Sequence, residues 1–251
     1  MLALIGLIAL LLAGCAEPPP ASEATEPSGE LTIFAAASLT DAFAAVTEAF
    51  TDRHPKVEVR QNLAGSQRLA GQLLAGAEAA VFASADSVQM AVVTEAGLVA
   101  GGPVTFATNA LAIAVELGNP REVTRLADLT APDVLLIMAA EDVPAGRYAR
   151  AALASAGVDV NPASLEPDVR AVLAKVALGE ADAGIVFTSD LVAAGERVEG
   201  VAIPTEHNVT ATYEIATLDD ARDAAAARAF IEFVRSDTGQ QILVDHGFGL
   251  P

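Results

Sequence analysis

Short apolar segments alternate with segments of helical periodicity along most of this chain. Residues 31–37 form a continuous run of apolar and small side chains, as in a strand that is buried on both faces. Residues 41–51 carry Phe43, Val46 and Phe50 at helical spacing, which predicts an amphipathic helix. Such alternation is typical of α/β folds in which helices connect the strands of a sheet.

The same two patterns recur to the end of the chain. Residues 105–115 contain two apolar stretches separated by Thr108-Asn109, which predicts a passage into a second domain. Further strands are predicted at 57–63, 80–84, 134–139, 184–188, 198–204 and 213–217. Helices are predicted at 66–76, 87–96, 146–156, 169–178, 219–235 and 237–246, with Asp219 and Asp220 at the start of the penultimate helix and Gly247 ending the last.

The N-terminal segment predicts export. Residues 1–13 are uncharged and apolar, and Leu12-Ala13-Gly14-Cys15 has the form of a lipobox. The apolar run is shorter than the about 20 residues that a membrane-spanning helix needs. We therefore expect a lipoprotein signal peptide at 1–14, lipid attachment at Cys15 and an extracytoplasmic, membrane-anchored protein. The proline- and glutamate-rich residues 15–29 predict a disordered tether.

Composition narrows the choice of partners. The formal net charge of -19 argues against nucleic acid as a partner, because such binding relies on lysine and arginine. The single cysteine excludes an intramolecular disulfide. If the ligand is an anion, its attraction must come from local dipoles, since the bulk charge repels it over roughly 8–10 Å at physiological salt.

Several predicted helices begin directly after strands, with small or hydroxyl residues at their first turn. Ser38, Ser66 and the region of Ala145 have this form. The first turn of a helix presents unpaired N–H groups and the positive end of the helix dipole, so such starts bind anions. Serine is also a common helix cap with no further role, and spacing alone leaves both interpretations open.

Six segments of the chain form an ordered set. They are FAAASLTDAF (34–43), LAGQLLAGAEAAVFASAD (69–86), VPAGRYA (143–149), DVRAVL (168–173), GEADAGIVFTSD (179–190) and GQQILVDHGF (239–248). Together they resemble the molybdate-binding proteins of ABC importers, over 31–250. The resemblance implies a two-lobed periplasmic-binding-protein fold of type II, each lobe a mostly parallel sheet flanked by helices. The lobes are expected at 30–107 with 213–251 and at 108–212, with the hinge near Asn109 and Ala211.

The resemblance also implies the binding site. Carried over by position, the oxyanion contacts fall on the backbone and hydroxyl groups of Ser38 and Ser66 and on the backbone N–H groups of Ala145 and Val169. The fifth contact in the family is a tyrosine hydroxyl, but Phe187 occupies that position here and has no donor. An unpaired ligand oxygen at this place would weaken binding by roughly 1–3 kcal/mol.

The implied ligand is molybdate or tungstate, bound through its oxygens without direct protein–metal ligands and without any cofactor. The implied partners are a membrane permease and its ATPase, and a monomer is expected. Two further departures from the family are Gln67, where a small residue is usual, and Ala80, where the family has aspartate. Gln67 is expected to narrow the mouth of the site, and Ala80 to concern support of its strand.

Three alternatives remain. Ser38 follows a strand as a hydrolase nucleophile does, but G-x-S-x-G is absent and His54, His207 and His246 fall in a turn, a loop and a helix end. Direct cation binding lacks a Cys/His cluster or EF-hand spacing. The acidic pairs that could bind a cation are expected to be solvated or helix N-terminal charge; they are Glu141-Asp142 and Asp219-Asp220. Tyrosine ligands are not expected either, because packing or hinge roles are predicted for Tyr148 and Tyr213. The closest alternative is the same fold binding sulfate, phosphate or chromate.

Overall fold

A computed structural model describes residues 26–219 and 221–251 of the chain. The predicted signal peptide, Cys15, most of the predicted tether and Asp220 lie outside these residues. The tether was predicted to reach residue 29, but the first strand already begins at Gly29. No helix of the described part combines the length and the apolar character needed to cross a membrane.

The first sheet has the strand order β2-β1-β3-β10-β4. β1 pairs in parallel with β2 and β3, and β10 pairs antiparallel with β3 and β4. Its strands are β1 (Gly29–Ala36), β2 (Val57–Ala64), β3 (Val81–Ser84), β4 (Val99–Asn109) and β10 (Ala211–Leu218). Its helices are α1 (Thr40–Arg53), α2 (Ser66–Leu74), α3 (Ser87–Glu95), α7 (Ala224–Arg235) and α8 (Asp237–Asp245).

The second sheet has the strand order β7-β6-β8-β5-β9. β6 pairs in parallel with β7 and β8, and β5 pairs antiparallel with β8 and β9. Its strands are β5 (Leu111–Glu116), β6 (Leu136–Ala139), β7 (Ser164–Glu166), β8 (Ala183–Phe187) and β9 (Val198–Ala202). Its helices are α4 (Pro144–Ser155), α5 (Val169–Ala177) and α6 (Thr188–Ala194), and short 3-10 turns lie at Ala37–Leu39, Leu126–Thr130 and Gly195–Arg197.

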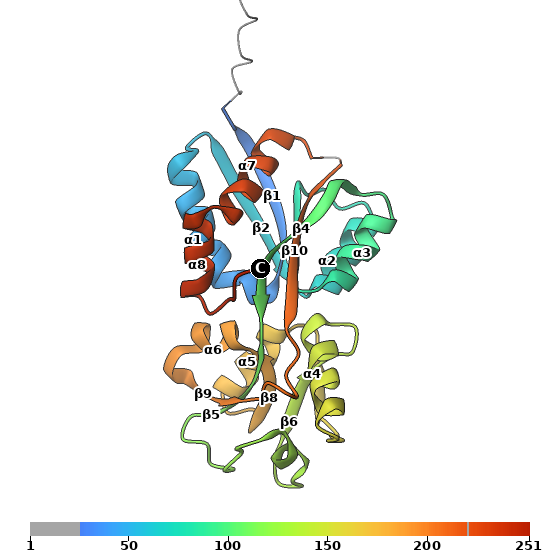
Figure 1. Ribbon diagram of the computed structural model, residues 1–251, viewed down its shortest axis with the longest axis vertical. Helices are drawn as coiled ribbons and strands as arrows, with labels where there is room; N and C mark the ends of the chain where they lie inside the picture. Colours follow the sequence, from blue (N-terminus) through green and yellow to red (C-terminus); the bar gives the residue numbers. More distant parts are fainter. Residues whose placement is uncertain (1–25, 220) are drawn as a thin grey trace, which may run out of the picture.

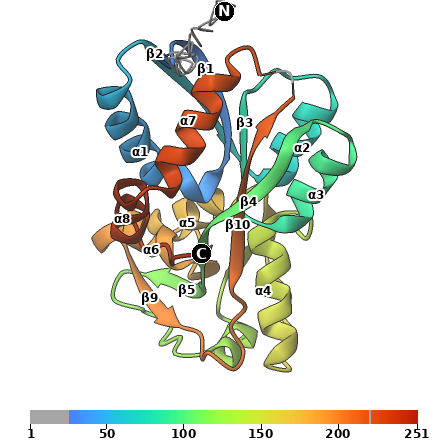
Figure 2. The same ribbon diagram turned by 45° about the horizontal axis from the view of Figure 1, so that its top comes forward.

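Each sheet with its helices forms one lobe (Figure 1). In the first lobe α1, α7 and α8 lie on one side of the sheet and α2 and α3 on the other. In the second lobe α4 lies on one side and α5 and α6 on the other. The chain crosses between the lobes where β4 continues into β5 and where it returns into β10, and these crossings run next to each other in both views (Figure 2).

Aromatic packing holds the helices of the first lobe onto their sheet. Phe43 of α1 lies 5.9 Å from Phe106 of β4 and 5.8 Å from Phe230 of α7, measured between ring centroids. Phe50 lies about two turns further along the same face of α1, and its ring contacts that of Phe230 at 5.2 Å. All four rings are fully buried, and large buried aromatic side chains contribute strongly to core stability. The periodicity of residues 41–51 therefore predicted the core-facing side of α1 correctly.

The α/β class and the two lobes are confirmed, but each sheet is mixed rather than mostly parallel. In both lobes one half of the sheet is parallel and the other antiparallel. The reason is that the crossing strands β5 and β10 enter the second and first sheet, respectively, from the other lobe. They run opposite to the strands that are connected by helices.

Some predicted elements begin or end elsewhere in the structure. The helix predicted at 219–235 begins at Ala224, because β10 continues to Leu218 and Asp219 donates its N–H to Leu98 O. Its cap is Asp223, whose carboxylate accepts from the N–H groups of the first turn. β7 and α6 were not predicted, since both are short, and the strand predicted to reach residue 188 ends at Phe187 where α6 begins.

The parallel strands of both lobes end at the boundary between the lobes. β1 leads into the turn of Ser38, β2 into α2, and β7 into α5. In open α/β sheets, ligands bind outside the carboxyl ends of such strands, where the following helices begin. This arrangement brings the helix starts of the first lobe opposite those of the second.

Candidate functional site

The five residues predicted for the site line one cavity between the lobes. The cavity is small, because the space open to the centre of a water-sized sphere is about 10 Å³, far below the volume of pockets for drug-sized ligands, so only a small ligand fits. The first lobe contributes what we call the first wall, made of Ala36, Ala37, Ser38, Gly65, Ser66 and Ala85. The second lobe contributes the second wall, made of Val143, Pro144, Ala145, Asp168, Val169 and Phe187.

The first wall presents two buried serine hydroxyls. Ser66 is the first residue of α2, and Ser38 lies in the 3-10 turn that precedes α1. Neither side chain caps its own helix, which removes the interpretation of these serines as ordinary caps. Ser66 Oγ instead accepts the N–H of Ala85 at 3.0 Å, and Ser38 Oγ lies 2.8 Å from the hydroxyl of Tyr213.

The second wall presents backbone N–H groups at two helix starts. Pro144 is the first residue of α4 and has no N–H, so Ala145 carries the first free N–H of that helix. Val169 is the first residue of α5. The carboxylate of Asp168 also lines the cavity, but it accepts the N–H of Ala171 at 2.9 Å as the helix cap.

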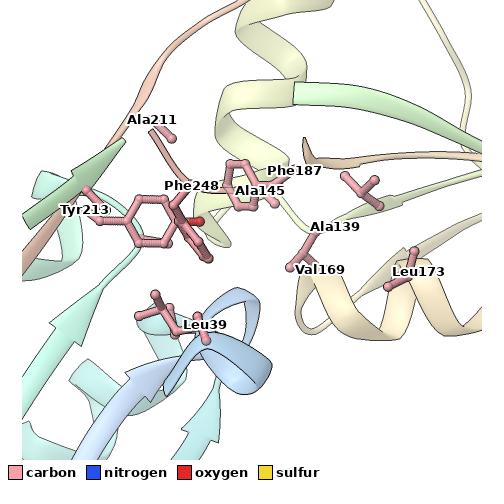
Figure 3. Close-up of a cluster of buried hydrophobic side chains, with 14 of the residues drawn as sticks. Leu39, Ala139, Ala145, Val169, Leu173, Phe187, Ala211, Tyr213 and Phe248 are labelled. Carbon is pink, nitrogen blue, oxygen red and sulfur yellow. The ribbon is translucent and has the colours of Figure 1, made fainter. Parts of the chain in front are cut away.

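Phe187 closes the second wall with a phenyl ring. It is the last residue of β8, is fully buried, and contacts the rings of Tyr148 and Tyr213 edge-on at 6.3 and 5.9 Å. Figure 3 shows Phe187 beside Ala145, with Tyr213 and Phe248 across from them and Val169 at the start of its helix. The ring offers no hydrogen-bond donor, so this part of the wall is apolar.

Two glycines permit close approach of the backbone around the cavity. A Cβ at Gly146 would lie 2.0 Å from Ala140 O, so the first turn of α4 packs directly onto the end of β6. A Cβ at Gly65 would lie 2.7 Å from Pro167 O of the opposite lobe. Both positions require the absence of a side chain, the first for the shape of the second wall and the second for the contact between the walls.

Polar contacts join the two lobes around the cavity. Gln67 Nε2 donates to Pro167 O at 2.9 Å, so this departure from the family bridges the walls at the rim. Arg147 Nη2 lies 2.9 Å from Oδ2 of Asp86, whose side chain is 2% exposed. Ion pairs with a buried partner are sensitive to the loss of either member, since a buried charge is left uncompensated.

Arg170 forms a third link between the lobes. Its Nη1 lies 2.7 Å from Asp41 Oδ2 of the first lobe, and its Nη2 donates to Ser38 O at 3.3 Å. Its Nε lies 2.8 Å from Oδ1 of the fully buried Asp190, without the alignment of a hydrogen bond, so this contact is ionic. Burial raises the pKa of Asp190 to about 7, although Arg170 counteracts this shift.

The cavity has the chemistry of an anion site that uses neutral donors. No lysine, arginine or histidine is among its lining residues, while helix starts and two hydroxyls face it. The dipoles of α2, α4 and α5 each direct their positive end towards the cavity. Among the described residues there is no group of three or more His, Cys, Asp or Glu side chains placed to bind a metal ion.

The hydrogen-bond partners of Ser38 differ from those of a hydrolase nucleophile. Its Oγ contacts Tyr213 rather than a histidine, and Nδ1 of His246 contacts the carbonyl of Ile242 at 2.7 Å. Ala80 lies away from the cavity, where its N–H donates to Thr32 O in support of β3. The sequence analysis assigned no role in the site to Gly65, Pro144 or Tyr213. The glycines Gly65 and Gly146 were the signals that could have indicated close backbone approach.

Comparisons with known proteins relate this chain to a family. The family model described as bacterial extracellular solute-binding protein matches residues 31–249. The molybdate-binding protein ModA of Mycobacterium tuberculosis H37Rv is 41% identical over 253 residues, covering 98% of this chain and 97% of that protein. A substrate-binding domain of a molybdenum ABC transporter from Clostridium difficile is 29% identical with a TM-score of 0.67, over 88% of this chain and 99% of that one.

A further solved structure shows how widely the fold is shared. The sulfate-binding protein SubI of Mycobacterium tuberculosis aligns with a TM-score of 0.80 at 18% identity, over 87% of this chain and 86% of that one. At this identity the likeness concerns the fold alone.

Proposed function

This chain belongs to the bacterial extracellular solute-binding proteins, and from that premise we propose that it is the extracytoplasmic component of an ABC importer that captures molybdate. Tungstate, of similar shape and charge, is the second expected ligand. The protein binds its ligand in the cavity between the lobes and delivers it to a membrane permease with a cytoplasmic ATPase. Its role is binding rather than catalysis, and it acts as a monomer. A lipid on Cys15 anchors it to the outer face of the cell membrane.

One observation carries this proposal: helix starts of both lobes converge on one small cavity without a cationic side chain. The proposed contacts are the N–H and hydroxyl groups of Ser38 and Ser66 and the N–H groups of Ala145 and Val169. Fixed N–H and O–H dipoles stabilise a dianion that is shielded from water, so no lysine or arginine has to be buried beside it. Phe187 contributes shape rather than a hydrogen bond.

Such a site selects among tetrahedral oxyanions by their size. The oxygens of a large tetrahedral oxyanion reach donors on both walls simultaneously, whereas a smaller anion leaves some donors beyond hydrogen-bond distance. The lobes are proposed at 30–107 with 213–251 and at 108–212. Motion at the crossings near Asn109 and Ala211 would open and close the cavity.

Calorimetric titration of the full chain with molybdate, tungstate, sulfate and phosphate tests the proposal. We expect heat of binding and a rise in unfolding temperature with molybdate and tungstate, because a ligand that binds only the folded state stabilises it. Sulfate and phosphate are expected to bind more weakly. Absence of both signals with molybdate and tungstate would contradict the proposal, and tightest binding of sulfate would reassign the ligand.

A further inference from the structure

The two serine hydroxyls of the first wall each have a partner behind them, away from the cavity. Ser66 Oγ accepts the N–H of Ala85 at 3.0 Å, and a backbone N–H is a donor only. The Ser66 hydroxyl therefore uses a lone pair on this contact and keeps its own proton for another acceptor. Both Ser66 and Ser38 are buried, at 1% and 3% exposure, so the proton has few places to go other than the cavity that they line.

The partner of Ser38 is the hydroxyl of Tyr213 at 2.8 Å, where either oxygen is able to donate. The direction is decided by Asn109. Its Oδ1 accepts the N–H of Ala110 at 3.0 Å and the hydroxyl of Thr188 at 2.8 Å, which fixes the orientation of the amide. The NH₂ group of Asn109 therefore donates to Ser189 Oγ at 2.8 Å and also faces Tyr213, with Nδ2 3.5 Å from the phenolic oxygen.

An amide NH₂ group is a donor only, so the phenolic oxygen is the acceptor on the side of Asn109. This leaves the phenolic proton for Ser38 Oγ. Tyr213 is fully buried, and burial raises the pKa of its hydroxyl well above the ordinary value, so the proton is present at neutral pH. Ser38 Oγ then accepts from Tyr213, as Ser66 Oγ accepts from Ala85.

We propose that Tyr213, oriented by Asn109, is a positioning residue that makes Ser38 a hydrogen-bond donor towards the cavity. Tyr213 lies in β10 behind the first wall and is not one of the residues that line the cavity. Each serine oxygen then has one lone pair occupied from behind and its proton directed to the cavity, so the first wall presents hydroxyl donors to the ligand. It therefore favours oxyanions whose oxygens are all deprotonated over hydrogen phosphate. This inference rests on the proposed function.

The test compares Tyr213→Phe with Tyr148→Phe, the matched removal of the only other tyrosine hydroxyl in the chain. Both full-length variants and the parent protein are titrated calorimetrically with molybdate and with phosphate at pH 7. We expect Tyr213→Phe to weaken molybdate binding about five- to tenfold, since one oriented hydrogen bond is lost, and Tyr148→Phe to stay within about twofold.

The ratio of the two affinities separates positioning from a structural defect. Without the tyrosine proton, Ser38 Oγ is free to accept from hydrogen phosphate, so the preference for molybdate over phosphate should fall in Tyr213→Phe. A packing defect would weaken both anions by the same factor. An unchanged molybdate affinity, or an unchanged ratio of affinities, would overturn the inference.

The Ser38→Ala background gives an independent check. If Tyr213 acts through Ser38, then adding Tyr213→Phe to Ser38→Ala should change the molybdate affinity by less than about twofold. A further loss equal to that of Tyr213→Phe alone would show that Tyr213 acts by another route.

A spectroscopic measurement covers the case in which Tyr213→Phe does not fold. The chain has no tryptophan and two tyrosines, so in Tyr148→Phe the fluorescence comes from Tyr213 alone. Saturating molybdate should change this emission, and the change should disappear when Ser38→Ala is added. Persistence of the change would contradict the link through Ser38.

The outcomes for the proposed function and for this inference are distinguishable. If the parent protein does not bind molybdate, the proposed function fails. If the parent protein binds molybdate and Tyr213→Phe binds it equally well, only this inference fails.

Discussion

The two walls of the cavity differ in what they offer to a ligand. The first wall carries hydroxyl side chains at Ser38 and Ser66, each held from behind by another polar group. The second wall carries Ala145, Val169 and Phe187, whose side chains have no polar atom, so its donors are backbone N–H groups. A side-chain substitution removes a donor from the first wall directly, whereas a donor of the second wall is lost only when the backbone moves.

The two walls therefore depend on different parts of the fold. The first wall requires correct orientation of two hydroxyl groups, which is set by hydrogen bonds with Ala85, directly after β3, and with Tyr213 of β10. The second wall requires that α4 and α5 begin at fixed places, and for α4 this depends on the close packing of Gly146 against the end of β6.

Removal of both hydroxyls should have the largest effect. In Ser38→Ala with Ser66→Ala, molybdate binding is expected to weaken by about 100-fold or more, since each hydrogen bond to a charged oxygen contributes about 1.5–3 kcal/mol. Calorimetry measures the affinity, and Ser155→Ala, an exposed serine of α4 outside the cavity, is the control. A loss of less than about fivefold would mean that the first wall does not bind through its hydroxyls.

Displacement of the second wall should have the next largest effect. A Cβ in Gly146→Ala would meet the carbonyl oxygens of Ala140 and Ala139 at 2.0 and 2.5 Å, so the start of α4 must shift. We expect molybdate affinity to fall by about tenfold and the free energy of unfolding to fall by about 1–3 kcal/mol. In the control Gly71→Ala of α2, the new Cβ meets nothing within 4 Å, so affinity should be unchanged and stability slightly higher. Equal behaviour of the two variants would contradict a backbone role for the second wall.

Local sequence patterns predicted much of the fold, because a strand or an amphipathic helix is marked by its own residues. The apolar run before Ser38 and the helical spacing of Phe43, Val46 and Phe50 are examples. The mixed character of the sheets was not predicted, since it depends on which distant strands pair. Ile215 of β10 lies opposite Ala83 of β3, and nothing in either segment indicates that partner.

The candidate site was predictable in its positions and not in its internal contacts. The resemblance placed Ser38, Ser66, Ala145, Val169 and Phe187 together, and the structure brings all of them to one cavity. The contact of Ser38 with Tyr213 joins residues 175 positions apart, and a packing or hinge role was expected for Tyr213. No local pattern reports a hydrogen bond at that separation, because it exists only after both lobes and their crossings have formed.

Addition of a hydroxyl to the second wall should give it a side-chain donor, as the first wall has, and strengthen molybdate binding. Phe187→Tyr places a phenol at the position that is apolar in this chain, and we expect molybdate to bind up to about tenfold more tightly. The measurement is calorimetric, with Phe233→Tyr as a control, because Phe233 is buried against Phe50 in the first lobe and does not line the cavity. Unchanged affinity of a folded Phe187→Tyr protein would mean that another group already serves the ligand oxygen near Phe187.

The last expected effect is on the pH dependence of stability behind the second wall, and not on ligand affinity. Asp190 is fully buried, accepts the N–H of Phe187 at 3.0 Å, and has its pKa raised by burial to about 7. An acid whose pKa is raised in the folded protein binds more protons folded than unfolded between its ordinary value, near 4, and about 7. Its contribution to stability is therefore fully present below about pH 4 and is lost as the pH rises through 7.

Asp190→Asn should abolish this part of the pH dependence, because asparagine keeps an acceptor for the N–H of Phe187 and does not titrate. Urea unfolding from about pH 4 to 8 should show a flatter decline of the free energy of unfolding in the variant than in the parent protein. The control is Asp128→Asn, since hydrogen bonds from Thr124 lower the pKa of Asp128 to about 2. Asp128 is ionised throughout most of this pH range, so its removal should shift the curve without changing its slope. Parallel curves for Asp190→Asn and the parent would show that Asp190 stays ionised beside Arg170, and that the second wall has a paired charge behind it, as the first wall has in Asp86.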